Sequence, residues 1–559
     1  MKRNLSELTN TVYDLVVVGG GIYGACVAWD AALRGLRVGL IEKSDFGSAT
    51  SANSLKIIHG GLRYLQHGDF RRMREYIRER STWMRIAPHL IHPLPFVVPT
   101  YGRCGWSKTL LSQALLLNDA IGFDRNRAGN PEKFIPRGKV VSKSECLQLV
   151  PGITLQDLRG GIVFHDAQVS NTERLLVSII RAAGEAGATS VNYVEVIGFL
   201  KSGSRVRGVK AKDILTGTRF DIQATCVVNA CGPWLGRVLA LLNGSAPATH
   251  YAAAMNLVTR SLFEKYAVGV SGRNGYEDPD TLISSKSPLL FVSPWRGRSI
   301  IGTRYRRYQG SPDEFRVTEK DIQQFVEEIR LSFPAAALRL EDVNFVHGGL
   351  LPCTQTSRAA GMVNLFKKHQ IVDHQGEGLA GVLSVVGVKY TSARVVAEEV
   401  VDRLFANRKQ KAPRSRTSAT PVYGGEIDRV ESFVHAEIGK QPCGLTEHSI
   451  RRLIHNYGSK YTDVLRHIEF SAPQGPNEDL AVLKAEVLHA VRDEMAQKLT
   501  DVVFRRTDLG SAGHPGNEAL RICVEAMGAE LGWGPERFRT ELDEISCVLH
   551  IGGNNQIAA

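Results

Sequence analysis

Short apolar runs alternate with a helix-length segment at the start of the chain. Residues 15–18 form an apolar, valine-rich run, residues 25–34 have helical composition and spacing, and residues 38–41 form a second apolar run. Short β-branched runs are typical of buried parallel strands, and Gly35 is suited to end a helix. The pattern therefore predicts a strand, a helix and a second strand within the first 41 residues.

Beyond the first 41 residues, the pattern predicts both strands and helices, and the C-terminal part of the chain is predicted to be mostly helical. The periodicity predicts a helix over 172–185, a strand hairpin over 205–221, a strand over 226–231 and an antiparallel sheet within 245–346. Two strands of that sheet, 289–293 and 299–303, flank a turn at 295–298. A strand and helix follow within 376–405, a basic Pro/Ser/Thr-rich linker at 406–425, and a mostly helical region at 426–550.

Three glycines mark the first strand-to-helix turn. Gly19, Gly21 and Gly24 form G-x-G-x-x-G directly after the first strand, and Glu42 ends the second. In such a unit the glycines allow a tight turn, close approach of a pyrophosphate and close helix packing, and the acid binds a ribose hydroxyl. The order of strand, glycines, helix, strand and acid predicts a dinucleotide site.

The next segment, residues 44–65, is rich in small polar residues and then in glycine. Thr50, Ser51 and Ser54 can donate hydrogen bonds to a pyrophosphate or flavin without adding bulk. The following HGGLRY sequence brings His59, Arg63 and Tyr64 beside two glycines, a combination that suits a flat ring, a proton and an anion. A plain Ser/Gly loop that leads into a helix is the alternative.

These motifs together resemble the FAD-dependent glycerol-3-phosphate dehydrogenases, which are quinone-linked relatives of D-amino-acid oxidase and glycine oxidase. The resemblance begins at residues 16–65 and resumes at 229–234, 291–295, 300–303 and 383–394. It returns at 493–496 and 504–507, so it spans most of the chain in collinear order.

The resemblance implies an α/β fold. It comprises a Rossmann-like FAD-binding domain of the D-amino-acid-oxidase type, a substrate cap with an antiparallel β-sheet, and a C-terminal helical domain. We expect the FAD-binding domain at 1–100, 155–235 and 345–405, the cap at 101–154 and 236–344, the linker at 406–425 and the helical domain at 426–559.

The resemblance also implies site residues. The residues expected to act on substrate are His59, Arg63, Tyr64, Thr303, Lys367 and Lys389. The residues expected to bind FAD are Gly19, Gly21, Ile22, Tyr23, Gly24, Glu42, Lys43, Thr50, Ser51, Ser54, Lys56, His59, Gly60, Val196, Gly232, Gly387, Lys389, Tyr390 and Thr391. Arg63 and Tyr64 are the expected phosphate ligands, and His59 the expected proton acceptor. No metal is expected.

The chain departs from the family pattern at the substrate side. Leu351 stands where the family has an arginine assigned to the substrate, and Lys367 or Lys368 falls near a second family arginine. Arg304 and Tyr305 follow Gly-Thr in place of Thr-Asp. Leu55 and Val388 replace a serine and a glycine. Either Arg304, Arg306 or Arg307 compensates, or the substrate is another anion.

Three functions remain open at this stage. The first is oxidation of sn-glycerol 3-phosphate or a close phosphorylated polyol to the ketone (dihydroxyacetone phosphate for the first), with hydride passing from C2 to flavin N5 and electrons to quinone. The second is a flavin oxidase or dehydrogenase of the same fold that acts on another anionic hydroxy or amino acid. The third, supported by Leu351, is a catalytically inactive FAD-binding scaffold.

Composition adds information on partners and compartment. The net charge of +12 suits an anionic substrate or membrane surface, but its even spread and the absence of nucleic-acid-binding motifs argue against nucleic acid. Nine cysteines without a CxxC pair favour a reducing, cytoplasmic compartment. No signal peptide or run of ~20 apolar residues is present. A homodimer stays open.

Two further segments invite opposite interpretations. Residues 105–123 are rich in leucine with basic flanks, which suits either a helix lying in the inner face of the cytoplasmic membrane or a core helix of the cap. In the C-terminal region, Glu486, Asp493, Glu494, Asp501, Arg505 and Arg506 recur at helical spacings, which predicts surface ion pairs or a docking face.

Overall fold

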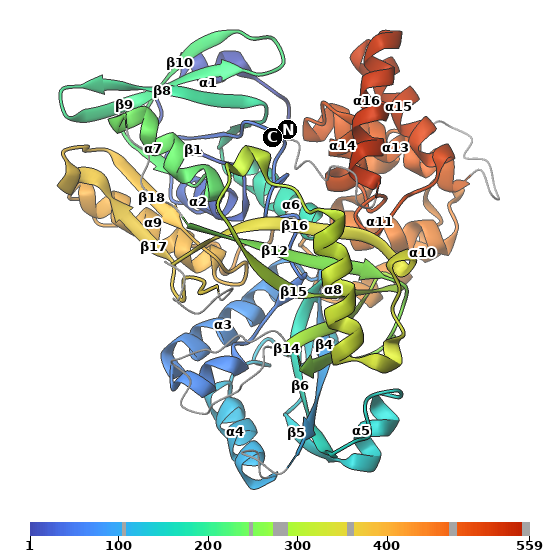
Figure 1. The fold of residues 1–559 in the computed structure, drawn as a ribbon. Helices are drawn as coiled ribbons and strands as arrows, with labels where there is room; N and C mark the ends of the chain where they lie inside the picture. Colours follow the sequence, from blue (N-terminus) through green and yellow to red (C-terminus); the bar gives the residue numbers. More distant parts are fainter. Residues whose placement is uncertain (103–107, 245–249, 272–288, 355–362, 469–477, 551–559) are drawn as a thin grey trace.

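The computed structural model describes residues 1–102, 108–244, 250–271, 289–354, 363–468 and 478–550. Two large sheets and a helical domain make up the molecule (Figure 1). Among the helices of these ranges, none combines the length and apolar character that a bilayer-crossing segment needs.

The first sheet carries the predicted dinucleotide unit. Its six strands have the order β17-β18-β11-β1-β2-β7, and every pair is parallel except β17 with β18. The strands are β1 (Leu15–Val18), β2 (Val38–Ile41), β7 (Thr189–Val191), β11 (Val227–Asn229), β17 (Gln370–Asp373) and β18 (Val382–Val386). Helix α2 (Ile22–Leu33) contacts both α6 (Thr172–Glu185) and α9 (Ala393–Asn407). The predicted strand–helix–strand unit and the helix at 172–185 are confirmed.

The second sheet has nine strands, of which eight follow the order β16-β12-β15-β14-β13-β4-β6-β3 and the ninth, β5, pairs with β6. All pairs are antiparallel except β13 with β4. Its strands are β3 (Ile57–Ile58), β4 (Ile91–Tyr101), β5 (Lys139–Ser142), β6 (Leu158–Val169), β12 (His250–Thr259), β13 (Ala267–Ser271), β14 (Leu289–Trp295), β15 (Arg298–Tyr308) and β16 (Val343–Cys353). The predicted hairpin is confirmed, since Trp295 pairs with Arg298.

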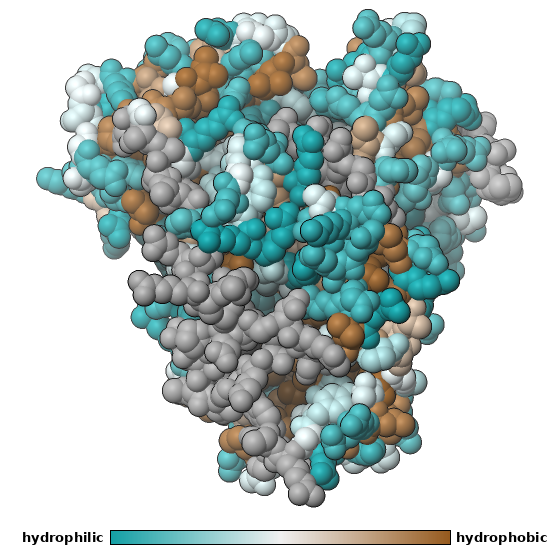
Figure 2. All heavy atoms as spheres, in the orientation of Figure 1, coloured by the Kyte–Doolittle hydropathy of each residue, from teal (hydrophilic) through white to brown (hydrophobic). Residues whose placement is uncertain are grey.

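Four strands of this sheet lie in segments predicted for the FAD-binding domain. β3, β6 and most of β4 and β16 fall within the predicted ranges 1–100, 155–235 and 345–405, yet they belong to the same sheet as the strands of the cap. Helix α8 (Glu319–Ser332) packs its apolar side on the sheet, and Figure 2 shows hydrophilic side chains along its outer side. The hairpin β9 (Arg205–Asp213) and β10 (Arg219–Gln223) joins β8 (Val194–Ser202) in a third, smaller sheet.

The C-terminal region is helical, as expected. Its helices are α10 (Val430–Lys440), α11 (Glu447–Tyr457), α12 (Tyr461–Leu465), α13 (Glu478–Glu494), α14 (Leu499–Asp501), α15 (Asn517–Leu531) and α16 (Pro535–Leu549). The remaining helices are α1 (Leu5–Asn10), α3 (Phe70–Ile86), α4 (Lys108–Ile121), α5 (Lys143–Leu149) and α7 (Leu235–Asn243). The connecting segment 406–425 packs on the first domain, where Val422 N–H donates to the Ile86 carbonyl over 2.9 Å.

Of the two interpretations of the charged residues at 486–506, surface ion pairs are wrong for the buried side chains, and the docking face is the one that the structure supports. Glu486, Glu494, Asp501 and Arg506 have no exposed surface, and Arg505 is buried as well. Glu494 pairs with Arg174 and Arg181 of α6, and Arg505 and Arg506 pair with Asp45, so these three side chains dock the helical domain onto the first domain. The helical spacing of charged residues alone could not distinguish a solvent-exposed helix face from this buried one.

Candidate functional site

Among the described residues, one pocket of about 1830 Å³ connects the dinucleotide turn with the cap sheet. Its lining comes from the turn between β1 and α2, the loop at 42–55, the strands β14, β15 and β16, and the segment 387–391. The pocket therefore lies where the two predicted binding regions meet.

At one end of the pocket, glycines shape the strand-to-helix turn. Gly19 has a φ of +105°, and a Cβ there would lie 2.8 Å from the Ala230 carbonyl oxygen. A Cβ on Gly24 would lie 1.9 Å from the Gly19 carbonyl oxygen, so only glycine allows α2 to pack this closely. Gly21 is the N-cap of α2 and lines the pocket. The positive end of α2 is thus open to an anion.

Glu42 is held firmly at the end of β2. Its Oε2 accepts from the Gly20 backbone N–H over 2.6 Å, and its Oε1 accepts from the Ser44 N–H over 2.9 Å. Burial raises the pKa of this carboxyl group, although both backbone hydrogen bonds oppose the shift. Val194 and Val196 line the same end, and the Val194 N–H donates to the Glu42 carbonyl over 2.8 Å. This end has the acid and the apolar wall that an adenosine needs.

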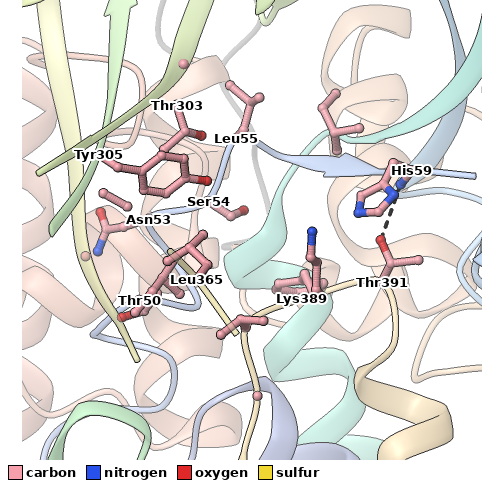
Figure 3. Close-up of a pocket in the computed structure, with 18 of the residues that line it drawn as sticks. Thr50, Asn53, Ser54, Leu55, His59, Thr303, Tyr305, Leu365, Lys389 and Thr391 are labelled. Atoms are coloured by element: carbon pink, nitrogen blue, oxygen red, sulfur yellow. Dashed lines mark hydrogen bonds between the residues drawn. The ribbon is translucent and has the colours of Figure 1, made fainter. Parts of the chain in front are cut away.

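Farther along, Tyr23 positions the turn that carries Lys389. The Tyr23 hydroxyl donates to the Lys389 carbonyl over 2.7 Å and accepts from the Lys389 N–H over 3.2 Å. Burial raises the pKa of Tyr23 to about 12, so the hydroxyl keeps its proton. A Cβ on Gly387 would lie 2.0 Å from the Tyr23 ring. The Lys389 side chain extends from this turn into the pocket (Figure 3).

An aromatic cluster lies beside Lys389. The rings of His59 and Tyr76 stack with centroids 4.8 Å apart, and Tyr64 meets Tyr76 edge-on at 5.2 Å. The Lys389 Nζ is 5.8 Å from the centre of the Tyr64 ring. The His59 backbone N–H donates to the Thr391 hydroxyl over 3.3 Å (Figure 3). A cation, an imidazole and a phenol therefore share one end of the pocket.

A hydrogen-bond network that sequence reasoning missed supports the opposite wall. The Thr303 hydroxyl donates to Asn256 Oδ1 over 2.8 Å, and Asn256 Nδ2 donates to the Asn53 carbonyl over 3.1 Å. Asn53 Oδ1 lies 3.2 Å from His347 Nδ1, whose Nε2 is 3.0 Å from the Ser511 carbonyl. Burial holds the pKa of His347 well below its ordinary range. A single asparagine in a loop, Asn53, and another in a strand, Asn256, gave no signal for this network.

Apolar side chains occupy much of the substrate side. Leu55, Leu351, Leu365 and Tyr305 line the pocket, and Figure 3 shows Leu55, Leu365 and Tyr305 around the space that Lys389 enters. The replacement of the family arginine by Leu351 is therefore a replacement within the pocket wall itself.

Two arginines of β15, Arg304 and Arg306, line the pocket, but each is paired with a carboxylate. Arg304 Nε lies 3.2 Å from Glu328 Oε2, and Arg306 Nε lies 2.7 Å from Asp321 Oδ1, both carboxylates belonging to α8. Each guanidinium is thus paired with an acid on the outer helix of the cap.

Most predicted site residues line this one pocket. They are Gly19, Gly21, Ile22, Tyr23, Glu42, Lys43, Thr50, Ser51, Ser54, His59, Tyr64, Val196, Gly232, Thr303, Lys367, Gly387, Lys389, Tyr390 and Thr391. Lys43 also forms an ion pair with Asp313 over 3.0 Å and lies over the Trp234 ring.

Four predicted residues lie elsewhere or cannot be placed. Gly24 and Gly60 are packing positions, since a Cβ on Gly60 would lie 2.4 Å from the Arg80 guanidinium. The Lys56 side chain is fully buried away from the lining, where its Nζ pairs with Glu173 over 2.9 Å. The side chain of Arg63 lies outside the described part of the chain.

The comparisons with known proteins agree with this geometry. Residues 14–403 match the family model of FAD dependent oxidoreductases, and residues 415–538 match the C-terminal domain of alpha-glycerophosphate oxidase. A glycerol-3-phosphate dehydrogenase of Synechocystis sp. is 32% identical, over 97% of each chain. The mitochondrial glycerol-3-phosphate dehydrogenase of Homo sapiens is 30% identical over 98% of this chain and 75% of its own.

A solved structure shares the whole fold. The glycerol-3-phosphate dehydrogenase of Bacillus halodurans, solved in complex with FAD, superposes with a TM-score of 0.76 at 24% identity and covers 98% of this chain and 97% of its own. The expected fold, with its D-amino-acid-oxidase-type domain, cap sheet and helical C-terminal domain, is confirmed. The chain belongs to the FAD-dependent oxidoreductases and, within them, to the glycerol-3-phosphate dehydrogenase family.

Proposed function

We propose that the protein oxidises sn-glycerol 3-phosphate to dihydroxyacetone phosphate with FAD as its redox cofactor and quinone as the final acceptor. The observation that carries the proposal is the single pocket joining the dinucleotide turn to His59, Lys389 and Lys367. Curated relatives of full length carry the name glycerol-3-phosphate dehydrogenase.

The residues present fit FAD. The positive end of α2, capped by Gly21, would hold the pyrophosphate, Glu42 would bind the ribose, and Val196 would contact the adenine. Thr50, Ser51 and Ser54 continue along the pocket toward the flavin end. When bound, FAD supplies the two-electron acceptor for the hydride that leaves C2.

The substrate side supplies charge and a proton acceptor. Lys389 and Lys367 attract the dianionic substrate, and Tyr64 offers its hydroxyl to the phosphate. His59 accepts the proton of the C2 hydroxyl, and its stacking on Tyr76 fixes the plane of the imidazole. Thr303, oriented by Asn256, borders the same space. Arg63 completes the phosphate site by its position in the motif.

Steady-state kinetics with a dye acceptor test this proposal. The purified flavoprotein should reduce the dye with sn-glycerol 3-phosphate and not with glycerol, because the cationic residues select the phosphate. An intact flavin spectrum without any turnover on phosphorylated polyols would rule the proposal out.

A second candidate function is favoured by one observation, the apolar wall of Leu55, Leu351, Leu365 and Tyr305. Such a wall suits an anionic hydroxy or amino acid that carries an apolar group, since arginines 304 and 306 are paired with α8. In the same assay, faster flavin reduction by a 2-hydroxy or 2-amino acid than by glycerol 3-phosphate would select this alternative. Formation of peroxide in air would identify an oxidase.

A membrane quinone as acceptor requires that the protein reach the bilayer. Helix α4 exposes Leu116 and Leu117, and Phe123 just after it is 78% exposed, whereas Leu111 and Leu115 are buried against the fold. We propose that this face rests in the membrane interface on the cytoplasmic side. Replacement of Leu116 and Leu117 by Ser should abolish flotation with anionic vesicles and leave dye reduction unchanged. Equal flotation of this variant would refute the contact.

A further inference from the structure

The loop that borders the adenosine end of the pocket contacts the C-terminal domain on its side away from the pocket. Lys43, Ser44, Gly47 and Ser48 line the pocket, but Asp45 between them does not. Its side chain has no exposed surface and contacts residues about 460 positions later in the chain.

Two consecutive arginines donate hydrogen bonds to the Asp45 carboxylate. Arg506 donates Nη1 to Asp45 Oδ2 over 2.8 Å and Nη2 to Oδ1 over 2.7 Å, a bidentate pair. Arg505 donates Nε to the same Oδ2 over 2.6 Å. Both arginines belong to a π-helical turn, Val502–Arg506. Bidentate pairs of this kind combine strength with a fixed geometry.

The charges of the cluster are balanced and continue to the pocket wall. Asp501 accepts from Arg505 Nη2 over 2.6 Å and from the Tyr193 hydroxyl over 2.7 Å. The Tyr193 backbone N–H donates to the Ser44 carbonyl over 3.0 Å, directly beside Asp45. Two aspartates thus face two arginines, and the contacts end at the two segments, 42–44 and 193–196, that border the adenosine.

We propose that Asp45 and its two arginines are positioning residues for FAD, through which the C-terminal domain holds the cofactor loop in its binding conformation. The proposal rests on the placement of the dinucleotide along the turn between β1 and α2. A loop that reaches its binding conformation only part of the time binds more weakly in proportion to that fraction. Anchored Asp45 keeps this fraction near one.

The test compares two buried, isosteric substitutions at the same domain interface. Asp45→Asn removes the charge behind the cofactor loop. Glu494→Gln removes an equally buried charge that pairs with Arg174 over 2.6 and 2.9 Å but lies away from the pocket lining. Release of FAD from each purified holoenzyme is followed by the rise of free flavin fluorescence after dilution, at a temperature where circular dichroism shows a folded protein.

We expect Asp45→Asn to release FAD about tenfold faster than wild type, which corresponds to ~1.4 kcal/mol, and Glu494→Gln to release it at nearly the wild-type rate. Arg505→Met, which keeps the bidentate Arg506 pair, should fall between them and serves if Asp45→Asn does not fold. Equal release by Asp45→Asn and wild type, or equal acceleration in both isosteric variants, would overturn the proposal. A wild-type protein that purifies without flavin would instead refute the proposed function.

Discussion

The two ends of the pocket are built in different ways. The dinucleotide end comes from β1, α2 and β2, adjacent elements within the first 41 residues, and its fit depends on backbone and on the absence of side chains. The substrate end combines His59, Tyr64 and Lys389 with a wall of side chains from β12, β15 and β16, which lie hundreds of residues from the loop they meet at Asn53. A single substitution can therefore change which substrate binds at the substrate end, whereas almost any substitution at the glycines of the dinucleotide end should prevent cofactor binding.

The largest effect is expected at the dinucleotide end, in Gly24→Val. The added Cβ would lie 1.9 Å from the Gly19 carbonyl oxygen, so helix and strand must separate at a cost of about 3 kcal/mol or more. We expect loss of bound flavin and a lower melting temperature, measured by visible absorbance and calorimetry.

Gly184→Ala is the matched control for that change. Gly184 lies in α6 with nothing within 4 Å of an added Cβ, so the substitution should raise stability by about 0.5–1 kcal/mol. If Gly24→Val bound as much flavin as the wild type, the dinucleotide end would tolerate an added side chain, and the proposed difference between the two ends of the pocket would be wrong.

The next largest effect is expected in Lys389→Met at the substrate end. Loss of the cation that enters the pocket should lower kcat/KM by about 10²–10³-fold while the flavin spectrum persists. Lys368→Met, on an exposed side chain outside the pocket lining, should leave kcat/KM unchanged. Equal losses in both variants would show that general surface charge, not this position, attracts the substrate.

Leu351→Arg should sharpen the comparison by restoring a guanidinium to the wall. If the substrate is glycerol 3-phosphate, KM should fall by about tenfold, because a phosphate accepts a bidentate pair. Leu351→Met, neutral and of similar size, should leave KM near the wild-type value. A rise in KM for the best substrate, specific to the arginine, would favour a substrate with an apolar group.

Acid should affect the substrate end through His347. Burial holds the pKa of His347 well below the ordinary value of 6.5, so below pH 6.5 the unfolded chain binds the proton that the folded chain does not. The contribution of His347 to the free energy of unfolding should be constant above pH 6.5. It should fall as the pH decreases below that value. Denaturant unfolding of His347→Gln should show a shallower fall.

His448→Gln is the control for this pH dependence. His448 is exposed on α11, so its removal should preserve the wild-type slope. If His347→Gln retained the full acid sensitivity, the buried network around Asn53 would not be its source.

The smallest effect is expected in Arg304→Gln. Because Glu328 already pairs with this guanidinium, its loss should change kcat/KM less than about threefold. The pair is largely buried, so the loss of Glu328's partner should lower stability by about 1–3 kcal/mol. A large rise in KM for glycerol 3-phosphate would instead show that Arg304 leaves Glu328 to bind the substrate, which restores the missing arginine.

The dinucleotide end could be predicted because its shape depends on residues that are close together in the sequence. Gly19, Gly21, Gly24 and Glu42 form a pattern within one strand–helix–strand unit, and each spacing has a direct geometric consequence. At the substrate end, the motif HGGLRY likewise predicted two residues that line the pocket, His59 and Tyr64, because they are close together in the sequence.

The substrate end and the domain interface could not be predicted this way. Asn256, Asn53 and His347 meet only through strand pairing, and nothing in their local sequences marks them. Lys56 lies within the motif, yet burial turns it toward Glu173. The charges at 494–506 follow a helical spacing typical of a surface, but Glu494 is buried against Arg174, and Arg505 and Arg506 are buried against Asp45, near the start of the chain.

Anaerobic reduction of the bound flavin by sn-glycerol 3-phosphate tests the central claim most directly. If one pocket holds both FAD and a phosphorylated polyol, the flavin absorbance should bleach at a rate that saturates with substrate and that Lys389→Met slows strongly. A flavin that dithionite bleaches but sn-glycerol 3-phosphate leaves oxidised at every concentration would contradict the account.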